Sequence, residues 1–290
     1  NGCKITLNGK VTAYTTEQPI CDVSITAKDV PLDSMLVSSL SDKKSDFYNQ
    51  LDMTGLADAD IKIFTPEHDS GPTSFIADVS LKKTSLSWGL LTEKANDFPL
   101  VISDVSAKTI ITPDLIQIED FTGRHNQALV SLTGQIRPGN ETQKPSYCLL
   151  LHAEQTELND ELISLMPQPL RKIVSELQPK GKVNLTANLN KTDSNSYPDY
   201  KITVDCPGNS INFEPFTYPV KNVTGRLTIT KNIIVLEDIT ATATDNTLIT
   251  SNISTVKING RIMLADDAFS DRLELSAGDI TFTADSLKIK

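Results

Sequence analysis

An internal repeat constrains the fold of this 290-residue chain more than any other feature of its sequence. The segment from Asp29 to Ile63 aligns without a gap with the segment from Gln155 to Leu189. Identical residues coincide at one constant offset: Leu32, Leu36, Ser38, Leu51 and Gly55 fall on Leu158, Leu162, Ser164, Leu177 and Gly181. Self-similarity over such a length indicates structural units that bury their apolar surfaces against neighbouring units.

The similarity continues downstream with a small shift. Asp104-Val105-Ser106 matches Asn222-Val223-Thr224, and LIQIEDFT from Leu115 matches IIVLEDIT from Ile233. Both copies then close on the pattern apolar-x-Gly-x-apolar, which occurs in three places: Leu7–Val11, Leu132–Ile136 and Ile258–Ile262. We therefore expect the tail of a preceding unit at residues 1–28, whole units at 29–154 and 155–278, and the start of a following unit at 279–290.

Most of each unit alternates apolar and polar residues, which is typical of a β-strand with one buried face. The segment Val183–Leu189 is the clearest example, and Arg226–Ile229, a turn at Lys231-Asn232 and Ile233–Ile239 predict a hairpin. The sequence therefore predicts a mainly β fold of antiparallel strands joined by polar turns.

One segment of each unit has helical spacing instead, at about residues 33–51 and 159–177. Leu36, Leu40, Phe47 and Leu51 share one helical face in the first copy. Asp33 and Asn159 are the expected N-caps of these segments. Pro167 and Pro169 should split the second segment into two short helices. Each unit is thus expected to carry a short helical insertion.

Composition excludes some classes of function. The formal net charge of −10 and the pI near 4.8 argue against nucleic acid, whose binding needs clustered Lys and Arg. No apolar stretch approaches the roughly 20 residues of a membrane-spanning helix, and the start does not resemble a signal peptide. A signal or membrane anchor would lie outside this sequence. The four cysteines form no C-x-x-C pair and leave the redox compartment open.

Candidates for catalysis or metal binding are few. The histidines, His68, His125 and His152, are scattered and show no metal-ligand spacing. The pairs Glu119-Asp120 and Glu237-Asp238 recur, but adjacent strand residues point to opposite faces and cannot form a facing dyad. We expect turn residues at strand ends there. Phosphate-binding and nucleophile motifs are absent from the sequence. The sequence predicts no enzyme, no catalytic residues, no metal site and no cofactor.

Several of these segments together resemble the AsmA-like superfamily of bacterial envelope proteins, which includes TamB-like and YhdP-like proteins. They are the Leu-[Asp/Asn]-x-x-Leu start of each unit, the VNLTANL strand from Val183, the YPVKNVTGRLTI segment from Tyr218, and the EDIT and EDFT steps before the closing glycine motif. The likeness spans nearly the whole chain and consists of apolar patterning and turn residues.

This resemblance implies an elongated, twisted antiparallel sheet curled into an open groove. It further implies a periplasmic segment of a longer protein anchored in the inner membrane, with inner- and outer-membrane proteins as candidate partners. The apolar groove would bind phospholipid acyl chains and contribute to intermembrane lipid transport and outer-membrane assembly or maintenance. The candidate lipid-facing residues are Val183, Leu185, Leu189, Leu227 and Ile229.

A second hypothesis uses the same alternation. The core of a closed β-sandwich or barrel also alternates apolar and polar residues, and periodicity does not distinguish acyl chains from opposing side chains. The chain would then be a structural or adhesive β-repeat segment of an envelope or surface protein that binds proteins or glycans.

Overall fold

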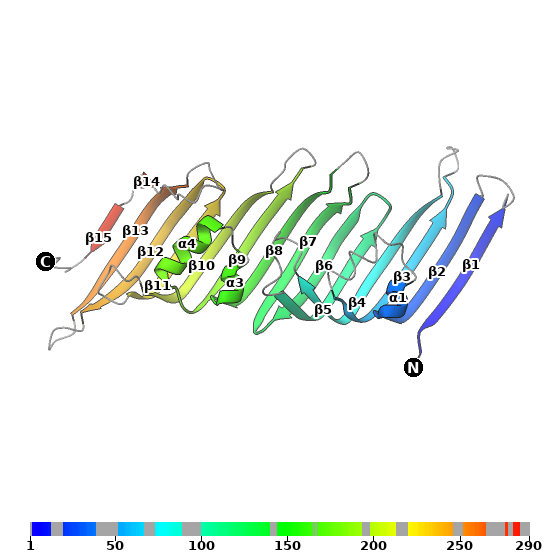
Figure 1. Ribbon diagram of the computed structural model, residues 1–290, viewed down its shortest axis with the longest axis horizontal. Helices are drawn as coiled ribbons and strands as arrows, with labels where there is room; N and C mark the ends of the chain where they lie inside the picture. Colours follow the sequence, from blue (N-terminus) through cyan, green and yellow to red (C-terminus); the bar gives the residue numbers. More distant parts are fainter. Residues whose placement is uncertain are drawn as a thin grey trace. The chain divides into compact units, whose positions relative to one another are not determined.

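The fold is mainly β, as the alternation predicts, and the strands are antiparallel with a few short helices (Figure 1). Neighbouring strands in the sheet follow one another in chain order, and the order does not return to β1. The computed structural model describes residues 2–12, 20–38, 52–66, 73–88, 100–139, 144–164, 166, 168–192, 198–212, 220–245, 252–264, 276–277 and 281–284.

The chain divides into two compact units. Unit 1 comprises residues 1–126, 130–150 and 190–197, and unit 2 comprises residues 127–129, 151–189 and 198–290. The strands that lie wholly or mostly in unit 1 are β1 (Lys4–Thr12), β2 (Ile20–Pro31), β3 (Thr54–Phe64), β4 (Ser74–Trp88), β5 (Leu100–Ile111), β6 (Ile116–His125) and β7 (Ala128–Arg137).

Unit 2 repeats the same kind of meander. Its strands are β8 (Ser146–Glu157), β9 (Lys182–Lys191), β10 (Asp199–Ile211), β11 (Val220–Thr230), β12 (Ile233–Asp245), β13 (Asn252–Met263), β14 (Ser276–Ala277) and β15 (Thr281–Ala284). The predicted hairpin is β11 and β12 with its turn at Lys231-Asn232, so that prediction is confirmed. Both β14 and β15 pair with β13.

Short helices occupy the two segments of helical spacing. In unit 1, α1 (Ser34–Ser38) begins after Asp33, whose carboxylate accepts hydrogen bonds from the amides of Met35 and Leu36 at 3.0 and 3.2 Å. Such bonds satisfy amides that a helix start leaves unpaired. The predicted cap is confirmed, while most of the remaining segment, 39–51, lies outside the described residues.

The second insertion forms two helices, α3 (Asp160–Ser164) and α4 (Gln168–Leu177), which confirms the predicted split. The Asn159 side chain accepts a hydrogen bond from the amide of Leu162 at 2.9 Å, as expected of an N-cap. Individual backbone hydrogen bonds also recur between the two copies. The amides of Leu32 and Leu158 each donate to the carbonyl of Gly55 or Gly181, both at 3.0 Å.

Bulges interrupt the strands at polar residues with left-handed backbone. The amide of Asp29 (φ 53°) donates to Asp58 Oδ1 at 3.0 Å, and the amide of Gln155 (φ 55°) donates to Asn184 Oδ1 at 2.9 Å. These two bonds occupy aligned positions of the repeat. A bulge bends its strand and increases the local twist, so each unit bends at equivalent places.

The two acidic pairs also belong to bulges, so the expectation that they end strands is wrong. Glu237 and Asp238 lie within β12 and together oppose Asn259 of β13. In β6, Glu119 is the extra residue between Ile118 and Asp120. A bulge leaves one residue unpaired in the middle of a strand. The Glu and Asp residues at these bulges are exposed, so their carboxylates are solvated.

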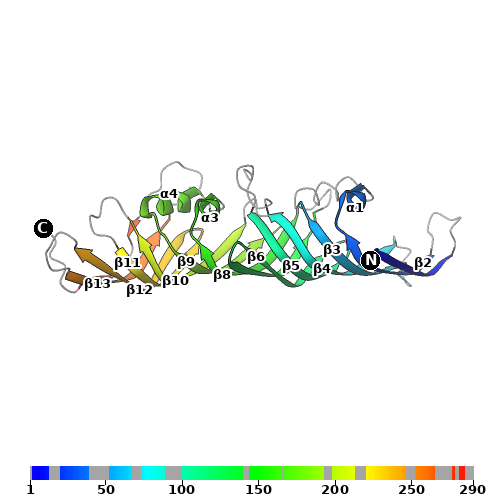
Figure 2. The same cartoon turned by 90° about the horizontal axis from the view of Figure 1, so that it is seen from below.

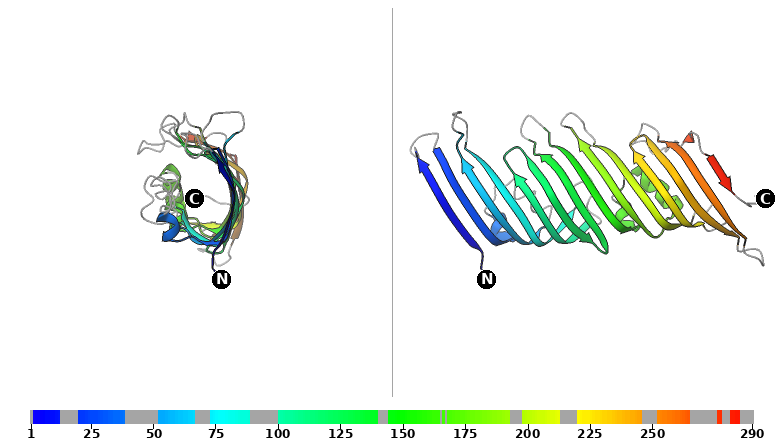
Figure 3. Two further views of the ribbon diagram at one scale, coloured as in Figure 1. Left: turned by 90° about the vertical axis from the view of Figure 1, so that its right-hand side faces the viewer. Right: turned by 180° about the vertical axis from the view of Figure 1, so that it is seen from behind.

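The strands of each unit curve along their length, which gives the sheet a concave and a convex face (Figure 3). Figure 2 shows α1 on one side of the strands of unit 1, and α3 and α4 on one side of the strands of unit 2. In unit 2, buried apolar residues form a cluster of Ile234 and Leu264 and a cluster of Val223, Ile239 and Ala241.

Candidate functional site

A row of apolar side chains crosses the strands of unit 1. Direct cross-strand partners in an antiparallel sheet project from the same face. The register pairs each member with the next, from β1 through β6. The apolar row consists of Leu7, Ile25, Ile61, Ala77, Ile111 and Ile116. One face of unit 1 therefore carries a continuous apolar band perpendicular to its strands.

The apolar row is only partly covered. Ile25, Ile61 and Ile111 are half-buried, and Leu7 is exposed. Ala77 of the row is 6% exposed, and burial is deeper still at the bulge of β5, where Ile102 and Val105 are 2% and 0% exposed. The same face thus has a packed part beside the bulges and an accessible apolar part beyond them.

Unit 2 has an equivalent row, formed by Ile202, Ile229, Ile234 and Ile262 through direct pairing across β10 to β13. Here the helical insertion contributes to the cover. Met166, between α3 and α4, packs against the cluster of Ile234 and Leu264. The helical insertion of unit 2 therefore lies on the apolar face of the sheet.

The five sequence candidates have different environments. Ile229 belongs to the row of unit 2, and Leu227 lies two residues before it on the same face of β11. Both are half-buried and pack against the clusters described above. Leu185 and Leu189 are half-buried on β9. Val183 is 1% exposed and has no free surface to offer a ligand. The structure gives no test of lipid contact at these residues, so that role stays a prediction.

The accessible residues of unit 1 were not singled out from the sequence. The repeat contained part of the signal, because Ile229 corresponds to Ile111 in the shifted alignment. Ile25 and Ile61 belong to alternating stretches of the same kind. Carrying the five candidates into the other copy gives Ala57, Ala59, Ile63, Thr109 and Ile111, of which Ile111 alone belongs to the row.

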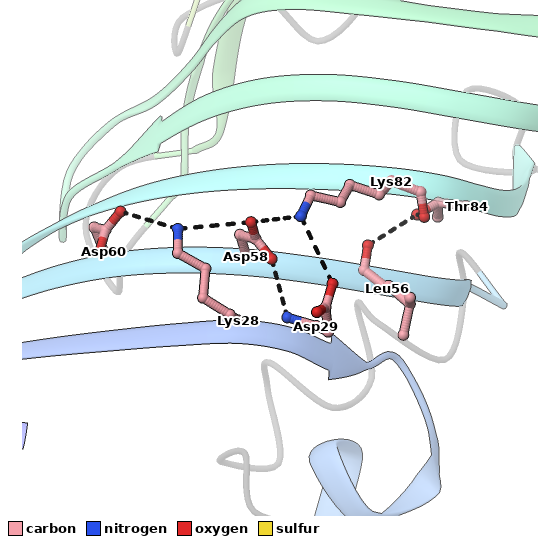
Figure 4. A network of polar contacts seen from close by, with 7 residues as sticks. All are labelled: Lys28, Asp29, Leu56, Asp58, Asp60, Lys82 and Thr84. Atoms are coloured by element: carbon pink, nitrogen blue, oxygen red, sulfur yellow. Dashed lines mark hydrogen bonds and ion pairs between the residues drawn. The ribbon is translucent and has the colours of Figure 1, made fainter. Parts of the chain in front are cut away.

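The opposite face of unit 1 is charged. Lys28, Asp58, Asp60 and Lys82 alternate with the apolar residues of β2, β3 and β4 and so project from the other side. Figure 4 shows their network. Lys82 Nζ lies 2.6 Å from Asp58 Oδ2, and Lys28 Nζ lies 3.6 Å from both Asp58 and Asp60. The sheet of unit 1 is therefore amphipathic.

Asp58 connects this network to the bulge of β2. The hydrogen bond from the Asp29 amide, followed by the contact with Lys82, lowers the pKa of Asp58 from 3.8 to about 2. The pKa of Lys82 is raised, chiefly by its hydrogen bond to Asp58. In unit 2, Arg226 binds Asp205 through Nε at 2.6 Å and Nη2 at 3.2 Å, which raises the pKa of Arg226.

Two of the three histidines lie within the described residues, and each contacts a neighbouring strand. His125 Nδ1 lies 3.0 Å from the carbonyl oxygen of Val101, and His152 Nδ1 lies 3.0 Å from Thr186 Oγ1. His68 lies outside the described residues. Within the described ranges no group of three His, Cys, Asp or Glu side chains could hold a metal ion. The four cysteines are free thiols.

Two further findings bear on this site. No helix in the part of the chain that the structure describes is both long and apolar enough to span a membrane. Comparison of the chain with protein-family models, curated proteins and solved structures finds no match.

Proposed function

We propose that this chain is a non-enzymatic, AsmA-like segment of a bacterial envelope protein whose apolar sheet face binds phospholipid acyl chains. In this proposal the segment works in the periplasm, as part of a longer protein anchored in the inner membrane. It contributes to lipid transport between the membranes and so to outer-membrane assembly or maintenance.

The observation that supports this proposal is the half-exposed apolar row of unit 1. Isolated exposed apolar residues are ordinary on a protein surface, but a contiguous band opposite a charged face indicates a binding surface. The row joins residues of β1 to β6 by direct pairing, while the other face carries the Lys28 and Asp58 network. Such a sheet can cover acyl chains and still present charges to water.

The dimensions and energetics agree with an acyl ligand. Neighbouring strands lie about 4.8 Å apart, so a row from β1 to β6 extends roughly 24 Å. The acyl chains of one leaflet occupy about half of a hydrocarbon core roughly 30 Å thick. Each methylene group moved from water onto an apolar surface contributes about 0.8 kcal/mol. A single acyl chain along the row would therefore bind reversibly, and the second chain of a phospholipid would add to the affinity.

The test is lipid retention by the detergent-free protein. The chain would be incubated with vesicles of phosphatidylethanolamine and phosphatidylglycerol, separated by gel filtration, and extracted for mass spectrometry. We expect bound phospholipid on the wild type and at least a tenfold loss in a double variant with Ile25→Asp and Ile61→Asp, because each carboxylate would lie beneath the acyl chain.

The matched control is Ile76→Asp, which makes the same change on the opposite face beside Lys62. It should retain lipid like the wild type, and far-UV circular dichroism should show all variants folded. A wild type without lipid, or equal lipid on all three proteins, would contradict the proposal. That result would favour a structural or adhesive repeat.

A further inference from the structure

Two buried polar side chains of unit 2 each carry an oxygen atom without a hydrogen-bond partner. Asn209 in β10 is 4% exposed and Thr156 in β8 is 5% exposed. Among the described residues, no group bonds to Oδ1 of Asn209 or to Oγ1 of Thr156. Most buried polar side chains bond to a protein group or to ordered water, because an unpaired one loses its hydration without compensation. The two oxygens therefore indicate a binding site for a small polar molecule.

The side chain of Asn209 lies on the apolar face of unit 2. Asn209 pairs directly with Val223 of β11, which belongs to a buried apolar cluster, and direct partners project from the same face. Its Nδ2 atom donates to the carbonyl oxygens of Lys180 and Lys182 at 3.4 and 3.0 Å. Because these bonds identify the nitrogen end of the amide, Oδ1 is the atom that still requires a donor.

The repeat places Thr156 beside this amide. Thr156 corresponds to Val30, which pairs directly with Ala57 in unit 1, and Ala57 corresponds to Val183. The register is the same in both copies, because the aligned bulge bonds described above join the same pairs of strands. Thr156 therefore lies opposite the buried Val183, next to the β9 carbonyl that Asn209 binds.

Unit 1 has a different pair of residues at the equivalent place. Thr84 corresponds to Asn209, and each pairs with the equivalent valine of the next strand. Oγ1 of Thr84 lies 3.5 Å from the carbonyl oxygen of Leu56, to which it donates. Val30, in the place of Thr156, has a hydrocarbon side chain. The same local fold thus forms in unit 1 with a bonded hydroxyl and a valine, so the unpaired oxygens are a specific property of unit 2.

The two side chains lie where the helical insertion joins the sheet. The amide of Leu158, two residues after Thr156, donates to the carbonyl of Gly181 at 3.0 Å. The carbonyl of Leu177, the last residue of α4, accepts a bond of 3.1 Å from the amide three residues after Asn209. A molecule that bonds to both side chains would therefore connect the two ends of the insertion.

The chemistry of the two oxygens limits what can bind. The amide oxygen only accepts hydrogen bonds, whereas the hydroxyl donates or accepts, so the ligand must supply a donor. A cation would need carboxylate ligands or a counter-charge, but Thr156 and Asn209 are neutral and their strand partners Val183 and Val223 are apolar. A small neutral molecule with O–H donors meets these requirements, and buried water typically makes about three such bonds.

We propose that internal water binds on the apolar face of unit 2, where it donates to Oδ1 of Asn209 and bonds to Oγ1 of Thr156. The water forms part of the junction between the sheet and the helical insertion. This site is independent of lipid binding.

The first test replaces Thr156 by its counterpart from unit 1, in the full chain. Where water is bound, Thr156→Val removes one of its partners and should lower the urea midpoint by about 0.3–0.5 M. Without bound water the same change removes an unpaired buried hydroxyl and should raise the midpoint. Thr228→Val, half-buried on the opposite face of β11, is the matched control for the effect of valine in a strand.

The second test detects the water directly, through water–amide nuclear Overhauser effects in the 15N-labelled, lipid-free chain. We expect cross-peaks at the amides of Val183 and Asn209 in the wild type. They should vanish in the double variant Thr156→Val/Asn209→Thr, which carries the pair found in unit 1 and whose fold is checked by far-UV circular dichroism.

Either of two results would overturn the proposal. One is a urea midpoint for Thr156→Val that equals or exceeds that of the Thr228→Val control. The other is a wild type without cross-peaks at these two amides. The first test relies on a single near-isosteric substitution, so it remains decisive even where the double variant does not fold.

Discussion

Two glycines on adjacent strands of unit 2 allow a steric contact to be separated from backbone strain. Gly225 in β11 and Gly208 in β10 both have left-handed backbone, with φ of 123° and 141°. A Cβ atom added at Gly225 would lie 2.6 Å from the carbonyl oxygen of Asp238 and 2.8 Å from Cα of Ile239. At Gly208 nothing lies within 4 Å of that atom.

Replacement of either glycine by alanine should therefore cost about 1–3 kcal/mol for the left-handed backbone. Only Gly225→Ala should add an overpacking cost of about 1–3 kcal/mol, because it meets the backbone of the β12 bulge instead of a movable side chain. The gain from a less flexible unfolded chain is common to both variants and cancels. The difference between the two free energies of unfolding is then the cost of the contact.

Urea unfolding followed by far-UV circular dichroism would measure both variants, and amide hydrogen exchange of residues 220–245 would localise the effect. We expect Gly225→Ala to unfold at lower urea concentration than Gly208→Ala and to lose protection at the bulge. Equal destabilisation by the two substitutions, or a larger loss for Gly208→Ala, would refute the reasoning that the close approach of β11 to the bulge requires glycine.

Three other predictions follow from the same structure. Because the pKa of Asp58 is lowered to about 2 in the folded chain, its ionised form stabilises the fold fully above pH 4, and this stabilisation is lost as the pH falls towards 2. Urea unfolding between pH 2 and 5 should show this loss of stability in the wild type and a smaller loss in Asp58→Asn. Val105→Ala should lower the free energy of unfolding by about 2–3 kcal/mol, whereas Val101→Ala on the same strand, 47% exposed, should change it by less than about 0.5 kcal/mol. Burial raises the pKa of the Cys206 thiol, so mass spectrometry at pH 8 should find iodoacetamide on the exposed Cys148 well before Cys206.

Local signals in the sequence predicted much of this fold. Alternation predicted the strands, and the capping positions of Asp33 and Asn159 depended only on residues a few positions away. The bulges could not be predicted in this way, because a bulge exists only where two residues of one strand oppose one residue of its partner. Asp104-Val105-Ser106 and Asn222-Val223-Thr224 were recognised as a repeated motif, yet alternation alone did not reveal left-handed backbone at Asp104 and Asn222. Asp and Asn tolerate that conformation better than most residues, which was the available clue.

The sequence predicted that the sheet has an apolar face, but it did not predict which residues of that face are accessible. Alternation indicated an apolar face, and Leu227 and Ile229 do belong to it. It did not separate Val183, which is fully covered, from Ile25 and Ile61, which remain half-exposed. Burial depends on what packs over a strand, such as the helical link at Met166, and that information is not local.

The agreement between strand order and chain order has a consequence for how the protein acquires its structure. Apart from β15, which pairs with β13, each described strand pairs with the strands next to it in the chain, so pairing closes only the turn or the helical insertion between two neighbours. Assembly can start at any hairpin and extend strand by strand as more of the polypeptide emerges from a ribosome or a translocation channel. In such a nearest-neighbour system a local defect halts or delays growth at one point and leaves the pairs already formed intact.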